Sequence, residues 1–180
     1  MVQIYMPLSI ATDRDLSEIS KAIYFLFVSR MTKDREVQIH RKDILTILRL
    51  ADKTYYNHLQ PLLDRGLIYR QKQVNSDKGF NVVIFTIPAQ PGEIFRFDNT
   101  DILRAGLHAK LVGMYIHVRA LLLTSGQLQT GWQKLDYLNN GLAQKRKDYL
   151  IALRKAGFLN IATTRNDIGQ MVIWVSLTNK

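Results

Sequence analysis

Apolar residues recur at helical spacing near the start of each half of the chain. They run from Leu16 to Phe27 in the first half and from Leu111 to Leu122 in the second. Steps of three and four residues place such side chains on one face of an α-helix, and that face is then buried. We therefore predict one core helix in each half. The inward residues are Leu16, Ile19, Ile23, Leu26 and Phe27, and then Leu111, Met114, Tyr115, Val118 and Leu122.

Two further helices and a hairpin are predicted after each core helix. In the first half the helices cover about 41–49 and a segment that begins after Asp52, a suitable N-cap, with only a tight turn between them. Apolar strand candidates then flank a polar, glycine-containing loop at 74–80. The corresponding helices of the second half cover about 132–138 and 143–156, and the loop is at 163–169. Short alternating segments at 3–7 and 94–98 predict a leading strand for each half.

The two halves align with each other when one is shifted by 91 residues. The shift places Tyr24 on Tyr115 and the phrase LLDRGLIYR, at 62–70, on LRKAGFLNI, at 153–161. Both phrases combine a helix end, a glycine that permits a left-handed cap, and the start of an apolar strand. Beyond this point a shift of 90 continues the alignment through the second strand candidate. The pattern predicts an internal duplication.

Strand, helix, helix, turn, helix and hairpin is the element order of the winged variant of the helix-turn-helix. Both halves resemble that family over nearly their whole length. The resemblance implies an α+β fold of two tandem winged-helix units. We place the first unit at 1–88, a short, stiff, proline-containing linker at 89–93, and the second unit at 94–180.

The first half also resembles a narrower family. AIYFLFVSRM at 22–31, followed by RKDILTILRLADKTYYNHLQPLLDRGLIYR at 41–70, is similar to the N-terminal winged-helix domain of replication initiators of Gram-positive plasmids. Tandem winged helices also occur in other plasmid initiators, in accessory DNA-binding proteins of conjugative elements, and in chromosome-segregation proteins that bind protein partners. The fold by itself does not decide among these roles.

Composition points to a polyanionic partner. The 180 residues include 25 Lys and Arg against 15 Asp and Glu, a formal net charge of +10 at pH 7. The chain has no cysteine, and its four histidines lack metal-ligand spacing, so we expect neither a metal nor a cofactor. Nucleotide-loop and hydrolase motifs are absent from the sequence, so we do not expect an enzyme. With no signal-peptide pattern and no long apolar run, we expect a cytoplasmic protein.

The third helix of a winged-helix unit enters the major groove, where residues opposite its core face meet base edges. An amide such as that of Asn57 suits the two-point hydrogen-bonding pattern of adenine. The residues predicted to contact DNA are Lys53, Thr54, Tyr56, Asn57 and Gln60 in the first half and Gln144, Lys145, Arg146, Lys147 and Asp148 in the second. The residues predicted to contact phosphates are Arg41, Lys42, Lys72, Lys78 and Arg165.

Pro61 falls in the middle of the first of these helices, where a missing amide and a ring clash cost ~3 kcal/mol. That helix is therefore either kinked or begins later than predicted.

The leading hypothesis is a sequence-specific duplex-DNA binder of a plasmid or other mobile element, active in transcription, replication initiation or conjugative transfer. It would act as a monomer with an internal pseudo-dimer, or as a homodimer, and would work with other proteins of that process. A winged-helix protein-interaction module is the alternative, and an RNA-binding regulator is a third possibility.

Overall fold

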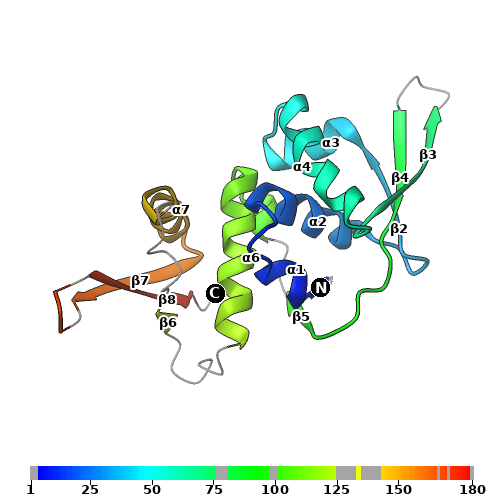
Figure 1. Cartoon of the computed structure of the whole chain (residues 1–180). Helices are drawn as coiled ribbons and strands as arrows, with labels where there is room; N and C mark the ends of the chain where they lie inside the picture. The colour runs from blue at the N-terminus through cyan, green and yellow to red at the C-terminus, as the bar shows by residue number, and fades with distance from the viewer. Residues whose placement is uncertain are drawn as a thin grey trace. The chain divides into compact units, whose positions relative to one another are not determined.

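The computed structural model describes residues 4–75, 81–97, 101–124, 133–134, 143–165, 167–169 and 171–178. It is a mixed α+β fold, as predicted, and its contacts divide the chain into two compact units, Met1–Gly113 and Met114–Lys180 (Figure 1). The first unit contains β1 (Ile4–Pro7), α1 (Leu8–Thr12), α2 (Glu18–Arg30), β2 (Glu36–His40), α3 (Arg41–Leu48), α4 (Asp52–Asp64), β3 (Tyr69–Asn75), β4 (Asn81–Thr86), β5 (Ile94–Phe97), α5 (Asp101–Arg104) and the start of α6 (Ala109–Thr124). The second contains the rest of α6, β6 (Gln133–Lys134), α7 (Ala143–Lys155), β7 (Leu159–Arg165) and β8 (Met171–Leu177).

Helix α2 is the centre of the first unit. The Ser17 hydroxyl caps it by accepting the Ser20 amide at 3.0 Å, one of the unpaired donors of a helix start. All predicted inward residues of this helix are buried, but so is every residue from Ile19 to Val28, whereas the spacing predicted a single buried face. Aromatic contacts join α2 to two strands: the rings of Phe25 and Phe97 and those of Phe27 and Phe85 each lie 4.7 Å apart.

A short turn from Arg49 to Ala51 joins helices α3 and α4 within this unit. Arg49 ends α3 in the left-handed conformation, and α4 begins at Asp52. The prediction that Asp52 is the N-cap was wrong, because Ala51 has the extended cap conformation and Asp52 is already the first helical residue. Pro61 lies inside α4, so the helix does not begin later than predicted.

The first unit's larger sheet has the strand order β2-β4-β3, with both pairs antiparallel. Figure 1 shows the β3–β4 hairpin extending away from α2. Strand β2 was not predicted. It alternates buried Val37 and Ile39 with more exposed neighbours, which is the pattern of a half-buried strand.

Strands β1 and β5, the two predicted leading strands, pair with each other in an antiparallel ribbon from Ile4–Phe97 to Pro7–Ile94. The segment between β4 and β5 is held at both ends. Arg35 donates to the carbonyl oxygens of Ile87 and Pro88, and the Glu93 carbonyl accepts the Leu8 amide at 2.8 Å. The contacts therefore divide the chain within α6, and the predicted linker at 89–93 lies inside the first unit.

The second unit repeats several features of the first. Its sheet has the order β6-β8-β7, and α7 has 13 residues, as α4 has. Glycines of positive φ, Gly66 and Gly157, follow these two helices. Gln133 and Lys134 were predicted to lie in a helix at 132–138, but they pair with β8 as the edge strand β6. The remaining positions of that predicted helix fall outside the described residues.

Candidate nucleic-acid interface

One face of α4 is apolar and buried, and the opposite face is polar and exposed. Tyr55, Leu59 and Leu62 are 3%, 5% and 0% exposed, so they form the core face of the helix. Because α-helical residues three and four apart share a face, the intervening positions point outward. The predicted contact residues Lys53, Tyr56, Asn57 and Gln60 are exposed, and Thr54 is half-buried.

An ion pair and a hydrogen bond link the starts of α3 and α4. Nη1 of Arg41 donates to Oδ2 of Asp52 at 3.1 Å and to the Tyr56 hydroxyl at 3.2 Å. The Tyr56 hydrogen bond and the negative charge of Asp52 raise the pKa of Arg41. Lys42 beside it is exposed as well. These two contacts thus hold the Arg41 guanidinium next to the polar face of α4.

Gln60 has an intrahelical partner. Its Nε2 donates to Oδ1 of Asp64 at 2.7 Å, one turn further along α4. An amide held in this way must exchange its partner before it can donate to a base edge. Of the two amide residues on this face, Asn57 therefore needs less rearrangement to read adenine.

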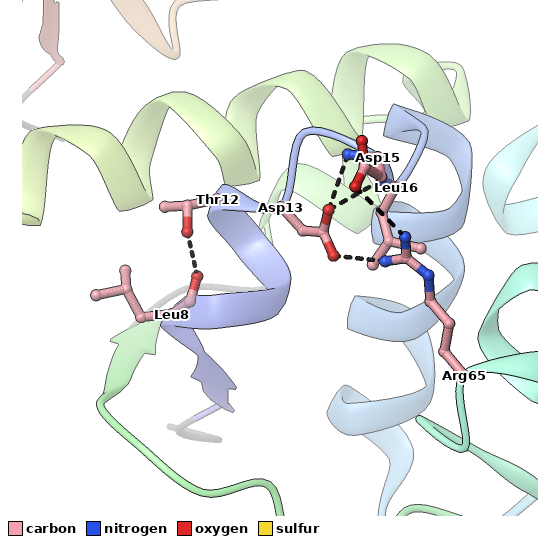
Figure 2. Close-up of polar contacts among 6 residues, drawn as sticks. All are labelled: Leu8, Thr12, Asp13, Asp15, Leu16 and Arg65. Atoms are coloured by element: carbon pink, nitrogen blue, oxygen red, sulfur yellow. Dashed lines mark hydrogen bonds and ion pairs between the residues drawn. The ribbon is translucent and has the colours of Figure 1, made fainter.

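The C-terminal end of α4 is tied to the loop before α2 (Figure 2). Arg65 donates to Asp13 and lies 3.8 Å from the carboxylate of Asp15. The other carboxylate oxygen of Asp13 accepts the amides of Asp15, at 2.8 Å, and Leu16, at 3.3 Å. Partial burial acts to raise the pKa of Asp13, but the Asp15 amide and Arg65 outweigh it, so that pKa is lowered.

Two of the predicted phosphate contacts lie at the first hairpin, and the structure gives no side-chain position for either. Lys72 belongs to β3, but its side chain is not described, and Lys78 lies outside the described residues. At the base of the hairpin, Tyr69, Arg70 and Gln71 are exposed. Exposed polar side chains therefore lie at the base of the hairpin as well as on α4.

In the second unit, α7 carries the predicted contact residues. Lys147 is half-buried and Asp148 is exposed, whereas the side chains of Gln144, Lys145 and Arg146 are not described. The exposed face continues with Ile151, which is 47% exposed.

Further cations of the second unit lie beyond the predicted contacts on α7. Arg154 and Lys155, in the last turn of α7, are exposed and were not predicted as contacts. The sequence could have predicted Arg154 and Lys155 as contacts, because they continue the helical spacing from Lys147 and Ile151. Arg165, a predicted phosphate contact, is exposed at the end of β7, where it pairs with Met171.

No family of known proteins matches this chain, and neither does any curated protein or solved structure. Within the described ranges, no three acidic or histidine side chains gather in a way that could hold a metal ion. The described helices are each too short or too polar to span a lipid bilayer.

Proposed function

We propose that this chain is a sequence-specific, duplex-DNA-binding protein made of two winged-helix units. The first unit supports this with the order α2, β2, α3, α4, β3, β4 and the sheet order β2-β4-β3. This is a three-helix arrangement with a short turn before its last helix and a hairpin after it. In such a unit α4 is the helix that enters the major groove.

The ends of α4 and α7 support the duplication. The Gly66 amide donates to the Leu63 carbonyl at 3.0 Å, and the Gly157 amide to the Arg154 carbonyl at 2.9 Å. The next amides, of Leu67 and Phe158, donate to the carbonyls of Leu62 and Leu153, both at 3.0 Å. Each of these pairs is separated by the same 91 positions found in the sequence. The two helices thus end in the same glycine-capped way.

The observation that carries the proposal is the outer face of α4. It combines lysine, tyrosine and amide side chains on a helix whose other face is fixed in the core by three buried residues, and Arg41 is held at its edge. Amides and cations are the groups that read base edges and bind phosphates. The formal net charge of +10 favours approach to a polyanion.

A salt titration of duplex binding tests the proposal. Binding should weaken steeply with salt, because each neutralised phosphate adds about 0.9 to the slope of log K against log salt. Asn57→Ala should lower affinity for a selected sequence by about 1–3 kcal/mol and leave random-sequence binding nearly unchanged. Thr46→Ala, at an exposed position on α3, is the matched control. Absent or salt-insensitive duplex binding would contradict the proposal.

The family resemblance of the first half favours a plasmid or other mobile element as the setting. In that setting the protein would act in replication initiation, transcription control or conjugative transfer, in the cytoplasm and with other proteins of the same process. Two different outer faces, on α4 and α7, predict an imperfect pair of half-sites. Footprinting on DNA upstream of its own gene would reveal which process the site belongs to.

A protein-interaction module is the second candidate, and the surface of α7 favours it. Ile151 is exposed at the position that corresponds to Gln60, and the neighbouring face carries the acid Asp148. An exposed isoleucine suits a protein partner better than a base edge. If Ile151→Ser leaves duplex binding intact but removes binding of a protein partner, the second unit has this role.

A further inference from the structure

A cluster of two cations and a histidine lies at the turn between α3 and α4, and two of its three residues come from a distant part of the chain. Arg49 ends α3, and its guanidinium lies over Gly106, where an added Cβ would come within 3.0 Å of Nη2. Nδ1 of His108, two residues further on, accepts the Lys110 amide at 3.3 Å. Arg49, His108 and Lys110 are all exposed.

The charges in this cluster act on one another. Burial lowers the pKa of His108, and the charges of Lys110 and then Arg49 lower it further. Burial and Lys110 likewise lower the pKa of His58, on α4, while Glu18 acts in the opposite direction. Lys110 therefore lies close enough to affect both imidazoles.

Among the residues that the structure describes, no acidic side chain forms an ion pair with this cluster. Gathered like charges repel one another, and an anion bound among them removes that repulsion. The cluster is thus electrostatically suited to an anionic ligand.

We infer that Arg49, His108 and Lys110 form a phosphate-binding site that holds the backbone of duplex DNA beside α4. The inference rests on the proposed function and adds a contact that the sequence did not predict. Arg49 is separated from the first residue of α4 only by Leu50 and Ala51. Phosphates flank the groove that a reading helix enters, so a cation at this turn is placed to bind one.

Gly106 makes room for Arg49 in this site. Its φ of +62° is in the left-handed region, and a methyl group at this position would crowd the guanidinium. Gly106→Ala would shift the tip of Arg49 by only a few tenths of an ångström and would strain the backbone at this left-handed position.

The test is the salt dependence of duplex binding by the full-length chain. Arg49→Ala and Lys110→Ala should each lower the slope of log K against log salt by about 1, and weaken binding to selected and random duplexes equally. Arg49→Lys should keep most of the slope, because it keeps the positive charge. Lys33→Ala is the control. Lys33 is exposed just beyond the C-terminal end of α2. Lys110 is near the opposite end of that helix, because Gly113, three residues after Lys110, lies against Glu18 at the start of α2.

The outcomes separate this inference from the proposed function. If the parent protein fails to bind duplex DNA, both are overturned. If Asn57→Ala loses specific binding while Arg49→Ala and Lys110→Ala keep the slope of Lys33→Ala, the phosphate site alone is overturned. If inorganic phosphate binds the DNA-free protein and Lys110→Ala abolishes this without changing the DNA slope, the cluster serves a free anion and the DNA contact is overturned.

Discussion

The guanidinium of Arg65, directly after α4, binds the carboxylate of Asp13 in the loop before α2, with Nη1 and Oδ2 2.5 Å apart. Asp13 also accepts two backbone amides of its own loop. The Asp13 carboxylate thus orders the loop before α2 and also binds the residue that directly follows α4 (Figure 2). The position of α4 on the first unit depends on this contact as well as on its buried face.

Asp13→Asn should destabilise the protein at neutral pH and much less in acid. Because the pKa of Asp13 is lowered below 3.8 in the folded state, its contribution is present above that pH and is lost as pH falls through the folded pKa. With the Arg65 side chain 38% exposed, we expect a loss of about 1 kcal/mol in the free energy of unfolding at pH 7. Urea unfolding at pH 7 and at about pH 2.5 measures the difference.

The matched control for this prediction is Asp34→Asn, at an exposed aspartate in the turn after α2. It should change stability little at either pH. An Asp13→Asn penalty that is as large in acid as at pH 7 would rule out the carboxylate as its source.

Gly113→Ala should destabilise the first unit. A Cβ on Gly113 would collide with the backbone of Glu18, so α6 and the start of α2 pack at the closest approach that a glycine allows. Overpacking against backbone costs about 1–3 kcal/mol, more than the roughly 1 kcal/mol that alanine gains in helix propensity. Thermal unfolding measures the result. A variant at least as stable as the parent would contradict this packing.

Lys110→Ala should raise the pKa of both His58 and His108. After burial, the charge of Lys110 is the largest cause that lowers each of these pKa values. Titration of the imidazole protons by NMR measures both, with Lys33→Ala as the control. In the parent protein, the lowered pKa values of both histidines mean that the unfolded chain binds protons more readily than the folded one. The free energy of unfolding of the parent should therefore fall as the pH drops below about 6.5. Unchanged pKa values in Lys110→Ala would place its ammonium elsewhere.

Tyr56→Phe should weaken duplex binding through Arg41. The Tyr56 hydroxyl and Asp52 share Nη1 of Arg41, so removing the hydroxyl frees the guanidinium from one of two restraints. We expect a loss of duplex-binding affinity that is smaller than that caused by Arg41→Ala. In an Arg41→Ala background the same substitution should have no effect. A full Tyr56→Phe effect in that background would show that the hydroxyl contacts DNA directly.

The sequence predicted the parts of this fold that depend on local patterns. The buried stripe of α4 follows from helical spacing, and the glycine ends of α4 and α7 follow from a residue that tolerates positive φ. Strand β2 was missed because its five residues run directly into α3, although the alternation of Val37 and Ile39 was a signal. The two-residue strand β6 is too short to show any alternation.

The candidate site likewise contains features that local sequence patterns predict and features that they do not. Exposure of Lys53 and Asn57 could be predicted because it is set by the buried face of the same helix. The Arg41–Asp52 pair depends on the turn between two helices, which a left-handed Arg49 closes. The contact of Arg49 with Gly106 joins residues far apart in the chain and has no local signature. Such contacts follow only from the tertiary structure.

Selection of duplex sites from a random library is the most direct test of the central claim. The two proposed reading helices, α4 and α7, predict enrichment of one imperfect pair of half-sites. Asn57→Ala should relax base preference in one half-site, and Lys147→Ala should weaken the other. Failure to enrich any duplex sequence, or an Asn57→Ala protein that selects the same site as the parent, would contradict the claim that α4 reads DNA.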